Sequence, residues 1–250
     1  MNTRVLLLVM GSMLLSVACS SSDPLPADTA PSAISPDNES VTTGIPASGT
    51  QASYRLTFDA SWSEATHPLN FPGNPHFSGL VGAVHNEQVR FWEPGQFASE
   101  GIEQMAETGG KSGLIDEVNQ AISEGTATAL LDGGGVGSSP GMVTLEFVVT
   151  RDYPQISVTS MLAPSPDWFV GLHNFSLLDD SGEFVDTARI ELRLYDSNTD
   201  DGTRYVSPNA PTVSPGPIML VTSDALDAPF INGQPSVGTF IIQRLESEAP

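Results

Sequence analysis

The chain of 250 residues contains 30 acidic and 9 basic residues, which gives a formal net charge of −21 at neutral pH. Such a charge repels nucleic acid and anionic lipid, so neither is expected as a direct partner. Hydrophobic residues make up 39% of the chain, which is enough for a folded core. After the N-terminal segment, no apolar run approaches the length of a membrane-spanning helix. The composition therefore favours solubility and the binding of cations.

Residues 1–18 are predicted to be a lipoprotein signal peptide. Arg4 supplies a short positive start, an apolar run extends from Val5 to Val17, and Cys19 follows directly. The segment resembles the lipobox of bacterial lipoproteins, with Ser16 where that motif prefers leucine. The resemblance implies lipidation of Cys19 and, in a Gram-negative host, an outer membrane lipoprotein on the periplasmic or cell-surface face. The alternative is an ordinary signal peptide with a chance cysteine.

Residues 19–51 are predicted to be a disordered tether. They are rich in Ser, Pro, Thr, Ala and Asp and show no hydrophobic period. About 30 residues of such a coil span on the order of 30 Å, which holds a domain away from a membrane surface. Cys19 is the only cysteine, so disulfides within the chain and cysteine ligands for a metal are excluded from the domain that follows.

Residues 52–250 are predicted to form one all-β domain. Tyr54, Leu56 and Phe58 alternate with polar residues, which is the period of a half-buried strand. Further strands are expected at 80–83, 89–92, 143–149, 156–160, 169–178, 190–194, 217–222 and 237–245. Turns rich in Gly, Pro, Asn and Asp separate these runs, which indicates an antiparallel β-sandwich.

Two short helices are expected within this sandwich. Apolar residues recur at helical spacing between Phe97 and Glu107, after Ser99 as a plausible N-cap. A second amphipathic pattern runs from Ser112 to Ile122.

An acidic turn and a rigid turn are the strongest signals of a site. Asp196, Asn198 and Asp200 alternate, and calcium prefers six to eight oxygen ligands of this kind. The turn is no EF-hand, because the sixth and twelfth positions lack the required Gly and Glu and strands flank it. Asp167 follows a stiff Pro-Ser-Pro segment, and the two turns are expected to meet. An acidic hairpin turn without metal is the alternative for residues 196–202.

A set of motifs between Tyr54 and Pro208 resembles a spondin domain, the module found in F-spondin and mindin. The matching segments are, in order, Tyr54 to Trp62, His67-Pro, Phe71-Pro, His76 to His85, Phe91-Trp-Glu-Pro-Gly, Ala98-Ser-Glu-Gly, Ala106-Glu-Thr-Gly, Ser160 to Gly171 and Tyr195 to Gly202. The ordered set covers about 150 residues, so it is far more specific than any single segment.

The resemblance implies a C2-like antiparallel β-sandwich with one bound calcium ion, whose ligands fall on Asp167, Asp196 and Asp200. The chain departs from the family at Ser197 and Asn198, where the family has Ala-Gly. It also lacks the cysteines of animal members, and no thrombospondin repeat follows. The glycan and integrin biology of animal relatives is therefore not carried over.

The expected function is non-enzymatic: a calcium-binding extracytoplasmic adhesion or ligand-binding module, held at the membrane through the N-terminal lipid only. Its partner would be an extracellular or periplasmic protein or glycan. The alternative is a carbohydrate-active hydrolase on a jelly-roll-like scaffold, suggested by Trp62, Trp92 and Trp168 together with acids such as Glu100 and Glu107. Calcium-directed contact with phospholipid is disfavoured by the acidic charge.

Overall fold

The computed structural model describes residues 39–42, 49–221 and 236–246. All of them belong to one compact unit that begins at Asn38. The predicted signal peptide 1–18, Cys19 and most of the predicted tether 19–51 lie outside the described residues. Within the tether range, Glu39–Thr42 form strand β1, which pairs antiparallel with β9 (Thr187–Leu192). The tether prediction did not include this strand.

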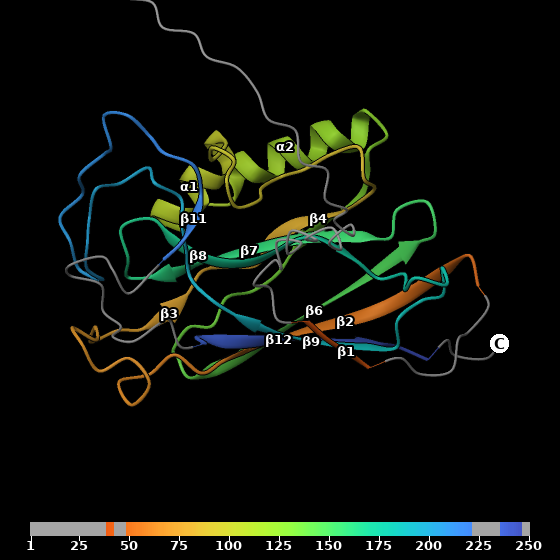
Figure 1. Ribbon diagram of the computed structural model, residues 1–250, viewed down its shortest axis with the longest axis horizontal. Coiled ribbons are helices and arrows are strands. Elements are labelled where there is room, and N and C mark those ends of the chain that lie inside the picture. The colour runs from red at the N-terminus through yellow and green to blue at the C-terminus, as the bar shows by residue number, and fades with distance from the viewer. Residues whose placement is uncertain (1–38, 43–48, 222–235, 247–250) are drawn as a thin grey trace, which may run out of the picture. The chain divides into compact units, whose positions relative to one another are not determined.

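Two antiparallel sheets lie face to face (Figure 1). The first contains, in spatial order, β1, β9, β12 (Gly238–Arg244), β2 (Gln51–Ala60) and β6 (Gly141–Thr150). The second contains β11 (Met219–Leu220), β10 (Tyr195–Asp196), β8 (Trp168–Ser176), β7 (Gln155–Ala163), β4 (Val81–His85) and β5 (Ala127–Asp132), with β3 (His76–Phe77) paired to β7. The predicted all-β sandwich is confirmed.

The main core lies between the two sheets. Tyr54, Leu56 and Phe58 of β2 are all fully buried, as their alternation predicts. Phe58 packs edge-to-face against Phe77 of β3 at 4.8 Å and against Phe240 of β12 at 5.2 Å. These contacts join both sheets through one aromatic cluster.

The two predicted helices are confirmed and cover the outer face of the second sheet (Figure 1). In α1 (Glu100–Thr108), the Ser99 hydroxyl accepts a hydrogen bond from the Ile102 N–H at 3.2 Å. Glu117 of α2 (Ser112–Ser123) accepts the Gly101 N–H at 2.8 Å. Residues from both helices and the sheet below form a second core. Among the described helices, neither is long and apolar enough to cross a membrane.

Two predicted strands differ from the structure, and strand β5 has no counterpart among the predicted strands. Residues 89–92 form a loop, because Phe91 and Trp92 are buried in the second core while the chain turns at Pro94 and Gly95. The strand expected at 217–222 is reduced to the two residues of β11. Strand β5 was not predicted, since its Ala-Thr-Ala-Leu-Leu-Asp sequence has no regular alternation.

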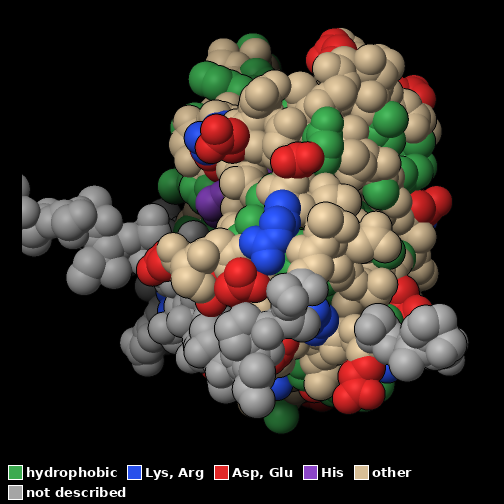
Figure 2. Space-filling view, turned by 90° about the vertical axis from the view of Figure 1, so that its right-hand side faces the viewer, with side chains coloured by type: hydrophobic (Ala, Val, Ile, Leu, Met, Phe, Trp, Pro, Cys, Tyr) green, Lys and Arg blue, Asp and Glu red, His purple; other side chains and the backbone are tan. Residues whose placement is uncertain are grey.

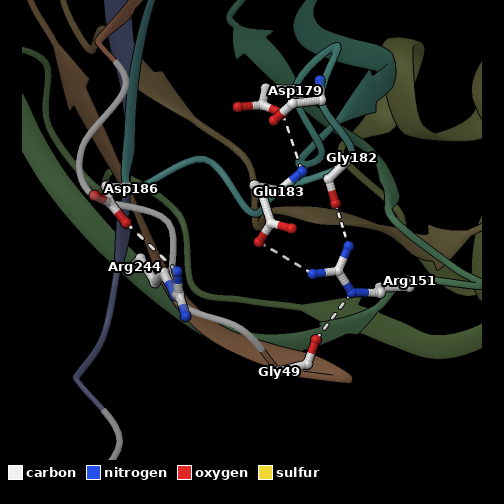
Figure 3. Close-up of polar contacts among 8 residues, drawn as sticks. Gly49, Arg151, Asp179, Gly182, Glu183, Asp186 and Arg244 are labelled. Atoms are coloured by element: carbon white, nitrogen blue, oxygen red, sulfur yellow. Dashed lines mark hydrogen bonds and ion pairs between the residues drawn. The ribbon is translucent and has the colours of Figure 1, made fainter.

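Arg151 fastens the turn after β6 to the loop at 179–184 (Figure 3). Its guanidinium donates to the carbonyl oxygens of Gly49 and Gly182 and pairs with Glu183 at 3.2 Å. It also lies 5.2 Å from the centre of the Phe184 ring.

Acidic side chains are scattered over the face of the molecule shown in Figure 2. Such a distribution suits solubility.

A buried histidine connects three strands of the second sheet. His85 at the end of β4 donates from Nδ1 to the Asn86 carbonyl at 2.8 Å, so in the neutral ring Nε2 accepts from the Ser157 hydroxyl at 2.8 Å. The Ser157 oxygen in turn accepts the Asn174 N–H at 3.0 Å. This network spans the irregular pairing between β7 and β8.

The His85 network predicts a loss of stability in mild acid. Burial lowers the pKa of His85 below its ordinary value of 6.5. The neutral form therefore stabilises the fold above the unfolded pKa, and this contribution is lost as pH falls through the folded pKa, by at most about 1.4 kcal/mol per pH unit. Urea unfolding at pH 7.5 and 5 should show this loss in the wild type and a smaller one in His85→Gln. Equal losses in both proteins would contradict the prediction.

Candidate metal centre

Strand pairing brings the two acidic turns together. Asp196 at the end of β10 pairs with Trp168 at the start of β8. The next residue, Ser197, donates its N–H to the carbonyl of Asp167 at 3.2 Å. Asp167 and the turn that begins at Asp196 are therefore neighbours at one end of strands β8 and β10, as expected from the sequence.

The buried carboxylate of Asp167 organises the acidic turn. One oxygen, Oδ2, accepts the N–H groups of Thr199 at 2.8 Å and Asp200 at 3.1 Å, and the Ser197 hydroxyl at 3.0 Å. Asp167 is fully buried, and no N–H or hydroxyl group of the described residues donates to its other oxygen, Oδ1. A hydrogen bond from the Asp196 side chain lowers the pKa of Asp167, so a proton shared between the two carboxyl groups, or a bound cation, would offset the charge buried here.

The other two predicted ligands also shape the turn. Asp196 accepts the Asn198 N–H at 2.7 Å. Asp200 is 5% exposed and accepts the N–H groups of Gly202 and Ala210, each at 2.7 Å. Both oxygens of Asp200 are therefore turned toward backbone groups, whereas Asp196 is only partly covered. The fold therefore brings the three predicted ligands together, but they differ in how far their carboxylate oxygens are already occupied by hydrogen bonds.

The two departures from the family pattern fit this turn. Asn198 has φ of 56°, a left-handed conformation that glycine favours and that asparagine tolerates well. Ser197 adds the hydroxyl that donates to Asp167. Gly202 is needed because a Cβ there would lie 2.6 Å from Cγ of Pro166. The rigid Pro-Ser-Pro segment thus packs directly on the acidic turn.

The carboxyl groups of the site repel one another. Burial raises the pKa of Asp167, although hydrogen bonds from Thr199 and Asp200 oppose the shift. Burial, followed by the charge of Asp167 and a hydrogen bond with its side chain, raises the pKa of Asp196 to about 7, and hydrogen bonds from the Asn198 N–H and the Trp168 side chain oppose the shift. Among the described residues, no Lys or Arg forms an ion pair with any of the three predicted ligands. Within the described part of the chain, hydrogen bonds offset this negative charge.

The donor chemistry of the site fits calcium. All the available ligands are oxygens, which suit a hard cation, and Oδ1 of Asp167, which accepts no N–H or hydroxyl group of the described residues, is one of them. In the described parts of the chain, however, no three His, Cys, Asp or Glu side chains already stand in an arrangement that could hold a metal ion. Binding therefore requires a side chain, such as Asp200, to turn away from its backbone partners. The ligand set Asp167, Asp196 and Asp200 stays a prediction.

Residue Glu107 of α1 belongs to the same neighbourhood and was not predicted as a ligand. Burial raises the pKa of Glu107, the charges of Glu103, Asp167 and Asp200 add to the shift, and a hydrogen bond from the Thr199 side chain opposes it. Its motif, Ala-Glu-Thr-Gly, was part of the family resemblance, but nothing in the sequence places it beside a turn so much later in the chain. A carboxylate in the last turn of a helix was the only local signal.

The family model described as Spondin_N matches residues 52–234. The chain belongs to the spondin N-terminal domain family. It is 38% identical to Spondin-1 of Gallus gallus over 185 residues and 34% identical to Spondin-1 of Homo sapiens over 204 residues. Spondin-2 of Homo sapiens is 31% identical over 183 residues. These alignments cover 72%, 78% and 71% of this chain but 23%, 25% and 55% of the relatives, so only part of each relative corresponds to it.

The spondin fold removes the main support for the hydrolase alternative. Trp62, Trp92 and Trp168 are 0%, 2% and 3% exposed, so none of them can line an open groove and stack on a sugar. Trp92 instead packs edge-to-face on Phe169 at 4.9 Å, inside the second core. The alternative is therefore not favoured.

Proposed function

We propose that this spondin domain is a non-enzymatic, calcium-binding adhesion or ligand-binding module that works outside the cytoplasm. The observation that carries the proposal is the fully buried carboxyl group of Asp167, which lies beside the carboxyl group of Asp196 and forms no ion pair with Lys or Arg among the described residues. Bound calcium would supply the positive charge that offsets this repulsion. Membership of the spondin family supports an extracellular role.

The residues of the site have separate tasks in this proposal. Asp167 is held in place by the N–H groups of the turn, so it offers a fixed oxygen. Asp196 and Asp200 offer oxygens from the turn itself. Cation binding would tie the Pro-Ser-Pro segment to the acidic turn and order the loops at this edge, where a partner protein or glycan is proposed to bind.

Binding to a partner is tested by an array of extracellular matrix proteins, periplasmic proteins and glycans, probed with the full chain in calcium or in chelator. The proposal expects at least one ligand to be retained only with calcium. The control is Asp167→Asn, which should behave in calcium as the wild type does in chelator. Ligand binding that is the same in calcium and in chelator would contradict a role for the site.

Anchoring to the outer membrane through lipid on Cys19 is part of the proposal. It is supported by the lipobox-like sequence that ends at Cys19. In a Gram-negative host, Cys19→Ser is expected to move the protein from the membrane fraction to the soluble periplasmic or secreted fraction. A Cys19→Ser variant that stays with the outer membrane would contradict lipid anchoring and leave the calcium site unaffected.

A further inference from the structure

Strand β6 forms a long open edge of the first sheet. Its ten residues pair on one side with β2, in a regular register without a bulge. Between Met142 and Val149, no described backbone group pairs with its other side. The other described edge strands are shorter, since β1 has four residues, β11 has two and β5 has six. A long and regular open edge is a template for pairing with another chain.

Alternate residues of β6 direct their backbone groups toward the open side. The Arg151 N–H donates to the Thr50 carbonyl at 3.2 Å, in the same register as the strand pairing that precedes it. Backbone groups alternate in direction along an antiparallel strand, so the odd-numbered residues of β6 hydrogen-bond to β2. The even-numbered residues therefore have N–H and C=O groups that can bond a further strand; they are Met142, Thr144, Glu146 and Val148.

The β6 edge lacks the features that usually prevent association. It contains neither Pro nor Lys. Its one charged residue, Glu146, forms an ion pair with Arg55 of β2 at 2.7 Å, so the charge is already partnered within the sheet. The outer face also exposes two apolar side chains, Met142 by 68% and Val148 by 44%. Another strand could therefore be added here without leaving a charge unpaired.

One antiparallel register makes the outer face of β6 complementary to itself. If Leu145 lies opposite Leu145 of a second copy, Met142 lies opposite Val148 and Thr144 lies opposite Glu146. The residues whose backbone groups point outward then face one another, as hydrogen-bonded pairs require. In the register centred on Glu146, two carboxylates would lie directly opposite each other, which is destabilising. The strand thus favours the register centred on Leu145.

The inner face of β6 is incompletely covered and fits the same register. Val143 and Leu145 face the main core but are only partly buried, whereas their β2 neighbours Phe58 and Leu56 are fully buried. With Leu145 opposite Leu145 of a second copy, Val143 lies opposite Phe147. All these inner pairs are apolar. Pairing would therefore remove further apolar surface from water on this side as well.

We infer that two copies of this chain dimerise through β6, which joins their five-stranded sheets into one continuous antiparallel sheet across a two-fold axis. The dimer does not depend on the calcium site. A contact limited to one strand edge is smaller than the roughly 1,200 Å² of a stable interface. Association is therefore expected to be reversible, with a dissociation constant of about 10–100 µM.

Sedimentation velocity of the full chain at about 5–500 µM tests the dimer. About 0.15 M salt screens the repulsion between two chains of net charge −21, and a reductant keeps Cys19 from linking them. The mass should rise with concentration toward that of two chains. Val148→Lys should weaken dimerisation at least about tenfold, because two lysines would then lie in the interface.

The matched control for Val148→Lys is Gln243→Lys. It places the same charge at an exposed position of β12, beside Arg55 and away from the open edge. It should change the dissociation constant by less than about twofold. A chain that stays monomeric over the whole range, or a dimer that both lysine variants weaken equally or leave unchanged, would overturn the inference.

Thr144→Lys tests the register. It would place a lysine opposite Glu146 of the second copy, twice in each dimer, so dimerisation should tighten by about two- to tenfold. Thr144 and Val148 are both exposed, and urea unfolding should show that each variant folds as the wild type does. Association that is weaker in Thr144→Lys than in the wild type would overturn the pairing of Thr144 with Glu146.

Discussion

Replacing Asp167 by asparagine is expected to abolish stabilisation by calcium and to leave the calcium-free domain at least as stable as the wild type. The asparagine oxygen can still accept the N–H groups of Thr199 and Asp200, and its amide group can donate toward Asp196. At about one hundred times the dissociation constant, calcium should stabilise the wild type by about 2.7 kcal/mol. For a domain of this size that is a rise in Tm of roughly 5–10 °C.

Asp167→Ala is the comparison that separates calcium binding from folding. Alanine removes the acceptor, so the buried N–H groups of the turn lose their partner at a cost of about 1–3 kcal/mol each. This variant should therefore be less stable in chelator as well as unresponsive to calcium. Thermal unfolding of the three proteins, each in calcium and in chelator, measures both effects. A calcium-dependent rise in Tm that survives in Asp167→Asn would exclude Asp167 as a ligand.

Trp92→Ala is expected to lower the free energy of unfolding by about 3–5 kcal/mol. The indole of Trp92 fills the second core between Phe169 and Tyr195, with ring centres 4.9 and 5.0 Å away. Its N–H also donates to the Leu172 carbonyl at 3.1 Å, which would lose this partner. The cavity and the lost hydrogen bond both destabilise the fold, so urea unfolding should show a large decrease in the free energy of unfolding.

Phe97→Ala is the matched control for Trp92. Phe97 is also aromatic and lies on the same segment before α1, but it is 68% exposed. Its removal should change stability by less than about 0.5 kcal/mol. If Trp92→Ala were nearly neutral for stability, Trp92 would be accessible in solution, and a sugar-binding role for it would have to be reconsidered.

The strands that were predicted correctly have a simple pattern. In β2, every second residue faces the core, so Tyr54, Leu56 and Phe58 indicate both the strand and its buried face. Helix α1 was equally predictable, because Ser99 caps its N-terminus and its apolar residues recur at helical spacing. Strand β5 was missed because its pairing with β4 and its contacts with α2, rather than an alternation in its sequence, determine its structure.

The candidate site was predictable only where a family motif marked it. Asp196 and Asp200 stand out by alternation, and Asp167 was assigned through the resemblance. Their proximity depends on the pairing of β8 with β10, which no local pattern specifies. The location of Glu107 near this turn could not be predicted from the sequence for the same reason, because it depends on how α1 packs on the sheet.

Calcium binding through Asp167, Asp196 and Asp200 is tested most directly by titration calorimetry of calcium into the chelator-treated wild-type chain at pH 8, with Asp167→Asn as the control. We expect one calcium ion to bind per wild-type chain and the variant to give no binding heat. No binding heat from the wild type, together with the same Tm in calcium and in chelator, would contradict it.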